Sequence, residues 1–362
     1  MLKEKVLVAM SGGVDSSVAA ALLKEQGYDV VGVTMQIWER DEGRGIRDEG
    51  KDARNCCSIS ATDDAKRVAA ILGIPHYTLN FRKIFKDCVI KDFISEYQHG
   101  RTPNPCIRCN EHIKFGALLK KADELGADYI ATGHYARVEM RGGRWEMRKG
   151  KDKIKDQSYV LYMLDQKTLS RVFFPLGGLT KIEVRKLARE FGLPVADKEE
   201  SQEICFVQND DYKSYLKGVL KNKIKPGPIV DLKGKVVGKH RGIEFYTIGQ
   251  RRGLGISHPT PLYVVSIDPK KNAVVVGEKR DVMGRELIAK DLHFVSGSTP
   301  SGKLELKAKI RYNAPQASAA VKAIGRGRVK VKFKKPQHAV TPGQSVVFYK
   351  GDAVVGGGII EK

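Results

Sequence analysis

The sequence has no apolar run long enough to cross a membrane. Nothing in its 362 residues approaches the roughly 18–20 consecutive apolar residues that a membrane-spanning helix needs. The opening residues, MLKEKVLVAMSGG, hold too short an apolar run for a signal peptide and instead predict a strand. We therefore expect a cytoplasmic protein with no membrane contact.

Cysteines and acidic residues are also few. Six cysteines in a chain of this length do not make a disulfide scaffold, and they indicate reduced thiols that do chemistry or bind a metal. The 42 acidic residues face 64 lysines and arginines, which leaves a formal net charge of +22. Such an excess favours a polyanionic partner, above all a nucleic acid.

Segments typical of strands and of helices alternate through the first two hundred residues. Short apolar runs predict the strands, and longer segments with helix-end signals predict the helices. The predicted strands are residues 5–10, 29–38, 75–81 and 128–135, and the predicted helices are residues 15–27, 60–73, 84–97 and 110–125. This alternation indicates an α/β fold class, with a parallel sheet and crossover helices.

The texture of the sequence changes after residue 207. Short, glycine-punctuated, β-rich segments follow, and from about residue 285 alternating runs such as GRVKVKFKK predict a small antiparallel β-barrel. The length also predicts two or three domains. We therefore divide the chain into residues 1–207, 208–284 and 285–362, and we expect the charged segment 39–55 to be a mobile surface loop.

The turn between the first predicted strand and helix lacks the lysine that ends a Walker phosphate loop. It nevertheless predicts an anion site, because the glycines of Ser11–Ser16 (SGGVDS) let the backbone turn tightly. The hydroxyls of Ser16 and Ser17 and the first amides of the helix then offer donors at its positive end.

Three cysteines suggest either a metal site or sulfur chemistry. Cys106 and Cys109 form a CxxC pair, and Cys205 follows much later in EICFV. A closed structural zinc site needs four ligands, and His112 is only a weak fourth candidate. The helix predicted to begin directly after Cys109 would favour its thiolate, which suits a nucleophile or a metal ligand.

The segment SGGVDS resembles the PP-loop of ATP pyrophosphatases, which split ATP between its α and β phosphates and adenylate a substrate oxygen. Further stretches, in order from residue 9 to residue 349, resemble the tRNA-specific 2-thiouridylase (MnmA/TrmU) family. They are AMSGGVDSS, GRTPNPCIRCNEHIKF, DYIATGHYARV, KDQSYVLYML, PLGGLTKIEVRKLA, EICFV, YTIGQRRGLGI, KIRYN and TPGQSVVFY.

The resemblance implies a tRNA-uridine 2-sulfurtransferase of three domains: an ATP-binding, catalytic PP-loop domain (adenine nucleotide α-hydrolase-like), a small central domain and a C-terminal, tRNA-binding antiparallel β-barrel. ATP, with Mg2+, would adenylate the C2 oxygen of the wobble uridine, and sulfur would replace it. The implied partners are tRNAs for glutamine, glutamate and lysine, and a cysteine desulfurase or sulfur-relay donor. Other PP-loop activities, amidation and 4-thiouridine synthesis, are alternatives that would need a glutaminase partner or another RNA-binding appendage.

The same resemblance assigns residues to the two substrates. The ATP contacts it implies are Ala9, Met10, Ser11, Gly12, Gly13, Val14, Asp15, Ser16, Met35 and Gly133. The tRNA contacts it implies are Asn104, Pro105, Cys106, His134, Lys155, Asp156, Gln157, Arg311, Tyr312 and Gln344, with residues 104–106 on the flipped-out base. Without the resemblance, Met35 would be assigned to the core and His134 to a structural role.

Two routes for the sulfur remain open. In one, Cys109 is the nucleophile and Cys205 bears a persulfide, whose terminal sulfur passes to the base and leaves a Cys109–Cys205 disulfide. Some family members have aspartate where this chain has Cys106. With cysteine there, Cys106, Cys109 and Cys205 could instead hold a 4Fe-4S iron-sulfur cluster whose open iron binds hydrosulfide.

The predicted barrel carries the densest positive charge. Between Lys303 and Lys335 stand eleven lysines and arginines and one acid, Glu305. A run of this kind on a small barrel favours a face that follows nucleic-acid phosphates.

Overall fold

The computed structural model describes residues 3–37, 59–199, 204–207, 211–299 and 302–362. The segment 39–55, predicted to be a mobile loop, lies outside these residues, as do Cys56 and Cys57. The chain forms two compact units. The first contains residues 1–89, 106–206 and 352–354, and the second contains residues 90–105, 207–351 and 355–362.

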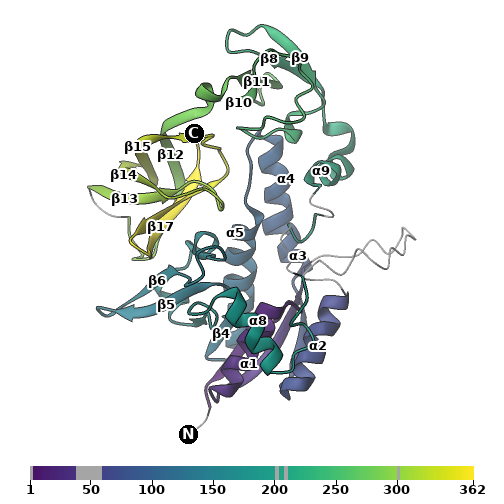
Figure 1. Ribbon diagram of the computed structural model, residues 1–362, viewed down its shortest axis with the longest axis vertical. Coiled ribbons are helices and arrows are strands. Elements are labelled where there is room, and N and C mark those ends of the chain that lie inside the picture. Colours follow the sequence, from purple (N-terminus) through teal and green to yellow (C-terminus); the bar gives the residue numbers. More distant parts are fainter. Residues whose placement is uncertain (1–2, 38–58, 200–203, 208–210, 300–301) are drawn as a thin grey trace. The chain divides into compact units, whose positions relative to one another are not determined.

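The first unit, whose strands are drawn in purple to teal in Figure 1, is built on a five-stranded sheet in the order β3-β2-β1-β4-β7. All four strand pairings are parallel, which confirms the predicted α/β fold. The strands are β1 (Lys5–Ala9), β2 (Asp29–Gln36), β3 (His76–Asn80), β4 (Tyr129–Thr132) and β7 (Val172–Phe173). Each of the first four strands lies within one of the four runs that the sequence predicts as strands. The carboxyl ends of β1, β2 and β4 therefore meet at one edge of the sheet, where open α/β sheets bind ligands.

Three helices share a hydrophobic core with one face of this sheet. They are α1 (Val14–Glu25), α2 (Ile59–Leu72) and α8 (Lys181–Glu190). Val6 and Val8 of β1, two residues apart and so on the same face, pack in this core with Val18 of α1 and Val184 of α8, all fully buried. Small residues such as Ala19 and Ala20 let α1 lie close to the sheet.

The helix predicted over residues 110–125 begins earlier than expected. Helical turns run without a break through α5 (Pro105–Cys109), the π-helical η3 (Asn110–Ala117) and α6 (Leu118–Glu124). The prediction was wrong because Pro105 begins the helix: proline has its φ fixed near the helical value and its missing N–H is not needed in the first turn. A similar continuous helix joins α3 (Arg82–Phe85), η2 (Lys86–Ile90) and α4 (Lys91–Gln98).

The first unit also holds elements that the sequence did not predict. A hairpin of β5 (Ala136–Arg141) and β6 (Arg144–Lys149) follows β4 directly. Further along the chain lie the 3-10 turn η4 (Ser158–Leu161) and the short helix α7 (Gln166–Leu169).

The second unit contains a small mixed sheet and a barrel. The small sheet has the order β10-β11-β8-β9, with β8 (Gly227–Val230), β9 (Val236–His240), β10 (Tyr263–Asp268) and β11 (Ala273–Gly277), and it follows helix α9 (Tyr212–Leu220). Tyr212 of α9 stacks on Tyr97, with ring centroids 5.0 Å apart. Residues 90–105 thus belong with this unit rather than with the parallel sheet.

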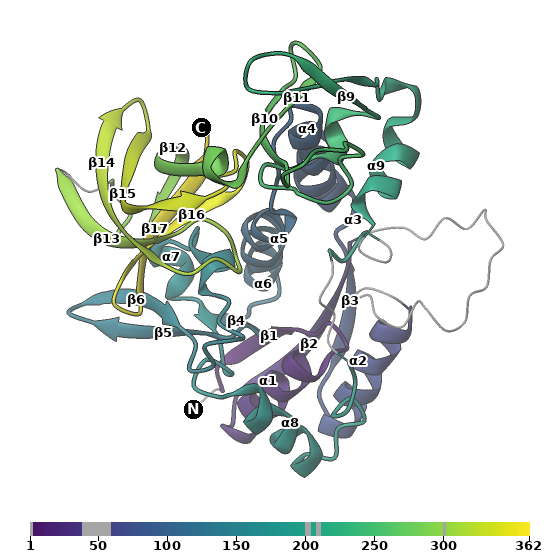
Figure 2. The ribbon, with the colours of Figure 1, turned by 45° about the horizontal axis from the view of Figure 1, so that its top comes forward.

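The barrel is antiparallel and closed, as predicted (Figure 2). Its order is β12-β15-β14-β13-β16-β17, and β12 pairs again with β17 to close it. The strands are β12 (Met283–Phe294), β13 (Lys303–Lys309), β14 (Ala317–Gly325), β15 (Arg328–His338), β16 (Ser345–Lys350) and β17 (Ala353–Ile360). Inward residues such as Val329, Val331 and Phe333 alternate with exposed lysines along β15. Within the described ranges, no helix has both the length and the apolar character needed to cross a bilayer.

Candidate active site

The glycine turn leaves the carboxyl end of β1 and enters α1 at once. Ala9 ends the strand, and the amide of Met10 donates to the carbonyl oxygen of Val33 at 2.8 Å. Gly12 has φ +68°, and a Cβ there would lie 2.0 Å from the carbonyl oxygen of Ala61. Only glycine therefore fits this position. Gly13 is the N-cap of α1 and has no side chain to cap the first turn, so backbone donors at the helix start are left for a ligand.

Hydroxyl groups hold the turn in shape. Ser16 Oγ accepts the amide of Ser11 at 3.1 Å, and Ser17 Oγ donates to the carbonyl oxygen of Gly13 at 2.9 Å. Ser16, Ser17 and Val14 are buried, whereas Ser11 is exposed at the tip. The turn is thus ordered by its own residues and presents its outer side to solvent, as a preformed anion site requires.

Asp15 is the acidic group of the turn, and two distant residues hold its carboxylate. Tyr135 Oη donates to Oδ1 at 2.7 Å, and Lys181 Nζ donates to Oδ1 at 2.7 Å and Oδ2 at 2.8 Å. A second lysine, Lys198, contacts the turn at Gly12. Its Nζ donates to the carbonyl oxygen of Gly12 at 3.1 Å and to Asp64 Oδ2 at 2.6 Å. The sequence analysis missed both lysines.

The ends of the neighbouring strands also reach the turn. A Cβ on Gly133, which follows β4, would lie 2.7 Å from the backbone nitrogen of Ser16, so only glycine allows this close approach. Val33 of β2 is in register with Ala9, which places half-buried Met35 two residues further toward the carboxyl edge. The structure therefore brings the residues expected to contact ATP to one edge of the sheet.

His134 is buried, with only 7% of its surface exposed. Burial, and secondarily the positive charge of Lys114, lowers the pKa of its imidazole well below 6.5. The ring is neutral at physiological pH. Lys114 Nζ, which can only donate, lies 3.4 Å from Nε2, and so Nδ1 carries the proton and donates to Thr132 Oγ1 at 2.6 Å.

Cys106 and Cys109 lie in the first turns of a helix. Because the helix begins at Pro105, it is Cys106, exposed, that stands in the first turn, and Cys109 is half-buried further along. The expectation that Cys109 precedes the helix start was wrong. Asn110, fully buried beside Cys109, donates its side-chain amide to the carbonyl oxygen of Val160 at 2.8 Å and so anchors this helix.

Cys205 lies in the short described segment 204–207 of the same unit. Its neighbour Phe206 is buried and packs edge-on against Phe85, with ring centroids 5.7 Å apart. Cys205 itself is half-buried, and the four described cysteines (Cys88, Cys106, Cys109 and Cys205) carry reduced thiols.

The described residues do not form a metal site. Across the described part of the chain, no three His, Cys, Asp or Glu side chains are grouped so that they could hold a metal ion. A cluster bound by Cys106, Cys109 and Cys205 would require such a grouping, so the residues as placed do not fit it.

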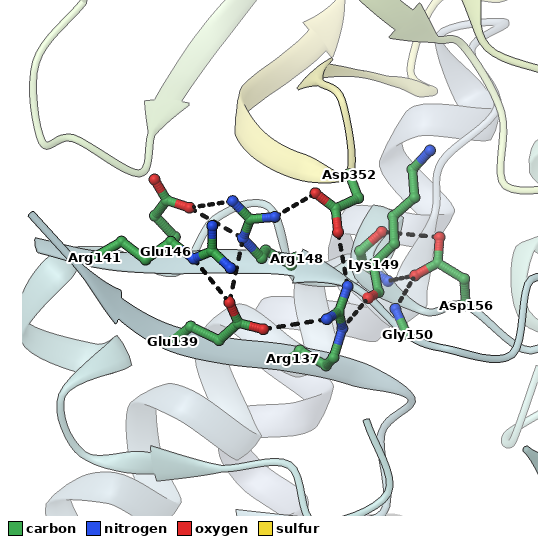
Figure 3. Close-up of polar contacts among 10 residues, drawn as sticks. Arg137, Glu139, Arg141, Glu146, Arg148, Lys149, Gly150, Asp156 and Asp352 are labelled. Atoms are coloured by element: carbon green, nitrogen blue, oxygen red, sulfur yellow. Dashed lines mark hydrogen bonds and ion pairs between the residues drawn. The ribbon is translucent and has the colours of Figure 1, made fainter. Parts of the chain in front are cut away.

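The segment expected to contact tRNA, Lys155–Asp156–Gln157, is fixed to the hairpin. Asp156 is buried and accepts the amide of Gly150 at 3.1 Å (Figure 3). It also accepts the amide of Ser158 at 3.1 Å. Gln157 Oε1 accepts the amide of Tyr135 at 3.0 Å. Half-buried Lys155 donates its own amide to Asp152 Oδ1 at 3.1 Å.

Ion pairs link the two strands of this hairpin to a further segment of the first unit. Figure 3 shows Arg137 and Arg148 on either side of Asp352, with N–O distances of 2.7 and 2.5 Å. Glu139 accepts from Arg137 and Glu146 from Arg148, at 3.1 and 2.8 Å. These pairs neutralise charges that would otherwise stand side by side on adjacent strands.

The barrel residues expected to contact tRNA also have contacts within the second unit. The guanidinium of Arg311 donates to the carbonyl oxygens of His338 and Ala339, and Lys309 Nζ lies 5.4 Å from the ring centroid of Tyr312. Gln344 bonds the backbone that precedes Pro105. The fold therefore accounts for Arg311 and Gln344 without a ligand.

Three family models match consecutive parts of the chain. A tRNA methyl transferase HUP domain matches residues 4–209, a tRNA methyl transferase PRC-barrel domain matches residues 213–278, and an aminomethyltransferase β-barrel domain matches residues 284–360. The first model alone spans more than half of the sequence.

Curated relatives match over the whole length. The chain is 55% identical to a tRNA-specific 2-thiouridylase MnmA 1 of Caldanaerobacter subterraneus, over 100% of this chain and 99% of that protein. It is 54% identical to a tRNA-specific 2-thiouridylase MnmA of Moorella thermoacetica, over 98% and 99%, and 53% identical to one of Clostridium perfringens, over 100% and 99%. The chain belongs to the tRNA-specific 2-thiouridylase (MnmA) family.

Proposed function

We propose that this protein is an ATP-dependent tRNA sulfurtransferase that converts the wobble uridine to 2-thiouridine. The observation that carries the proposal is the uncapped glycine turn at the carboxyl edge of a parallel sheet, in the same unit as the thiols of Cys109 and Cys205. Full-length identity to 2-thiouridylases supports the same reaction.

The first step activates the base. ATP enters as its Mg2+ complex, with its phosphates on the turn from Ala9 to Ser16 and its adenosine beside Met35 and Gly133. The C2 oxygen of the uridine attacks the α-phosphorus, and the bond to the bridging oxygen breaks. Pyrophosphate leaves with that electron pair, and loss of the N3 proton leaves the adenylated base neutral. The uridine must be flipped out of its stack for this attack, and Asn104–Cys106 are the residues proposed to contact it.

The second step exchanges oxygen for sulfur. The terminal sulfur of a persulfide on Cys205 attacks C2, and AMP leaves with the C2 oxygen. The Cys109 thiolate then attacks the sulfur of Cys205, which releases 2-thiouridine and forms a Cys109–Cys205 disulfide. A dithiol reductant supplies two electrons to restore both thiols, and a cysteine desulfurase or sulfur relay reloads Cys205.

The iron-sulfur route has less support than the persulfide route. It requires Cys106, Cys109 and Cys205 to converge on one cluster, and the described residues contain no group of three that could hold a metal. Anaerobic purification followed by iron and sulfide analysis tests the point directly. An iron-free protein that still thiolates tRNA supports the persulfide route, whereas activity that scales with bound iron would replace it.

A row of lysines on the barrel provides a face for tRNA. Strand register places Lys303 opposite Lys322, and Lys322 opposite Lys330, and all three side chains are exposed. Lys303 and Lys330 each also contact an acid, Glu305 at 2.9 Å and Glu286 at 2.7 Å, yet three lysines remain side by side on adjacent strands, and we propose this row as a phosphate-binding surface. Lys155, Asp156, Gln157 and His134 of the first unit, and Arg311, Tyr312 and Gln344 of the second, are proposed as further tRNA contacts or their supports.

The proposal extends to the domains of the protein, its cellular compartment and its tRNA substrates. Residues 1–207 would form the catalytic domain, 208–284 the central domain and 285–362 the tRNA-binding barrel, in the cytoplasm. The tRNAs for glutamine, glutamate and lysine are the proposed substrates.

The nucleotide and nucleoside products test the reaction. Protein, Mg2+, ATP and a lysine tRNA should release AMP and pyrophosphate, and with a sulfur donor the digested tRNA should contain 2-thiouridine. Release of ADP, or 4-thiouridine in the digest, would contradict the proposal.

A further inference from the structure

The glycine turn binds a triphosphate in the proposed function, yet it contains no cation of its own. Its only charged residue is Asp15, whose carboxylate would repel the phosphates. A Walker loop resolves the same problem with an internal lysine. Any positive charge that the protein adds to that of the Mg2+ bound by ATP must here come from another part of the chain.

Lys181 and Lys198 supply that charge from a single later segment. Lys181 Nζ lies 2.7 Å from Asp15 Oδ1, and Lys198 Nζ lies 3.1 Å from the carbonyl oxygen of Gly12. Each lysine is also paired with an acid, since Lys198 contacts Asp64 at 2.6 Å. The two lysines thus lie at opposite ends of the Gly12–Asp15 stretch, and each can exchange its carboxylate partner for a phosphate oxygen.

The position of Lys181 in its helix supports a functional role. It is the first residue of α8, after the N-cap Thr180, and its side chain is only 11% exposed. A cation at the positive end of a helix is electrostatically unfavourable. Its amide is held by Asp152 Oδ2 at 3.0 Å, so the backbone is fixed while the ammonium points to the turn.

We propose that Lys181 and Lys198 bind the β- and γ-phosphates of ATP and neutralise pyrophosphate as it leaves the α-phosphorus. This inference rests on the proposed function, since it assigns the phosphate contacts of the same ATP site. Tyr135, which donates to Asp15 Oδ1 at 2.7 Å, keeps the Asp15 carboxylate in place when Lys181 turns to the phosphates.

Nucleotide affinity separates this role from a structural one. In Lys181→Met and Lys198→Met, the affinity for ATP should fall about ten- to hundredfold, the usual effect of removing one charge-assisted hydrogen bond. The affinity for AMP, which lacks the β- and γ-phosphates, should stay within about twofold, and this also shows that the site has folded. Lys181→Arg should recover part of the ATP affinity.

Lys186→Met is the matched control, because Lys186 lies on the same helix with its side chain 77% exposed. It should bind both nucleotides as the unmodified protein does. Equal losses for ATP and AMP, or no loss for ATP, would overturn the lysine proposal while thiolation by the unmodified protein still stood. Conversely, a selective loss of ATP affinity in a protein that makes no 2-thiouridine would uphold the phosphate contacts and refute only the proposed function.

Discussion

Gln344 fixes the backbone of Thr102 in the segment that leads to the CxxC helix. Its side-chain amide nitrogen donates to the carbonyl oxygen of Thr102 at 2.9 Å and to that of Pro103 at 3.2 Å. The backbones of the two segments also lie close together. The amide of Thr102 donates to the carbonyl oxygen of Pro342 at 2.9 Å, and a Cβ on Gly343 would lie 2.9 Å from the Thr102 nitrogen. The turn before β16 therefore supports the residues proposed to contact the target base.

Gln344→Ala removes both side-chain hydrogen bonds and should loosen this segment by about 1–2 kcal/mol. Backbone hydrogen exchange should speed up at Thr102, and the thiolation rate should fall more than the affinity for tRNA. Gln337→Ala is the control, because the Gln337 amide bonds only carbonyl oxygens of its own strand. A large loss of tRNA affinity with unchanged exchange at Thr102 would instead make Gln344 a direct tRNA contact.

Cys205→Ser should separate activation from sulfur transfer. The serine hydroxyl cannot carry a persulfide, so 2-thiouridine should fall by at least about 10³-fold, as when a catalytic nucleophile is lost. Pyrophosphate release in the presence of ATP and tRNA should continue, because adenylation does not involve the thiol. Cys88→Ser, in η2, is the matched control and should retain thiolation. Normal thiolation by Cys205→Ser would mean that another sulfur serves.

The lysine row on the barrel predicts the salt dependence of tRNA binding. Changing Lys303, Lys322 and Lys330 to Gln should weaken binding at low salt and reduce the slope of log K against log salt by roughly 2 to 3, or 0.7–0.9 for each lost phosphate contact. The affinity and slope come from filter binding between 50 and 300 mM salt.

A control variant removes the same charge from exposed helix positions of the first unit, with Lys66, Lys121 and Lys186 changed to Gln. Its slope should match that of the unmodified protein. If the two triple variants reduce the slope equally, tRNA senses only net charge and the row is not a binding face.

The sequence predicted the first four strands of the parallel sheet because each follows or precedes turn residues, and because β1, β2 and β4 are short apolar runs that are largely buried. The edge strand β3 is largely exposed, and the two-residue β7 was not predicted. It could not predict the β5–β6 hairpin, whose strands ARVEMR and RWEMRK are rich in charge and depend on cross-strand pairs such as Arg148 with Glu139. These ion pairs between β5 and β6 can be recognised only when it is known that the two strands pair.

The glycine turn was also recognisable from the sequence. Its residues are adjacent in the chain, and glycine is needed there because Gly12 has a positive φ. Lys181 was not recognisable, because it lies 166 residues from Asp15 and no local pattern shows that its ammonium contacts that carboxylate. The Thr180–Glu183 capping box marks the helix start that Lys181 follows, but it does not show what the lysine faces in the fold. Contacts formed only by folding set the charge of this site, and local sequence patterns do not contain them.

The buried imidazole of His134 should make stability depend on pH. Its pKa in the folded protein lies well below 6.5, chiefly because burial disfavours the charged ring, whereas in the unfolded chain it titrates near 6.5. Between these two values the unfolded state binds more protons than the folded state. The contribution of the neutral His134 ring to the free energy of unfolding should therefore be complete above about pH 6.5. It should decrease as the pH drops toward the pKa of the folded state.

His134→Gln tests this linkage, since glutamine retains hydrogen-bonding capacity toward Thr132 and does not titrate. Urea unfolding from pH 7.5 down to pH 5 should show a smaller loss of stability in the variant than in the unmodified protein, even if the variant is less stable at pH 7.5. Lys114→Met should raise the pKa of His134, because the neighbouring ammonium is the second cause of its lowering. This variant should therefore also lose less stability than the unmodified protein as the pH falls. Identical pH slopes in all three proteins would mean that His134 has the same pKa in the folded and unfolded states, which would contradict the lowering of its pKa by burial.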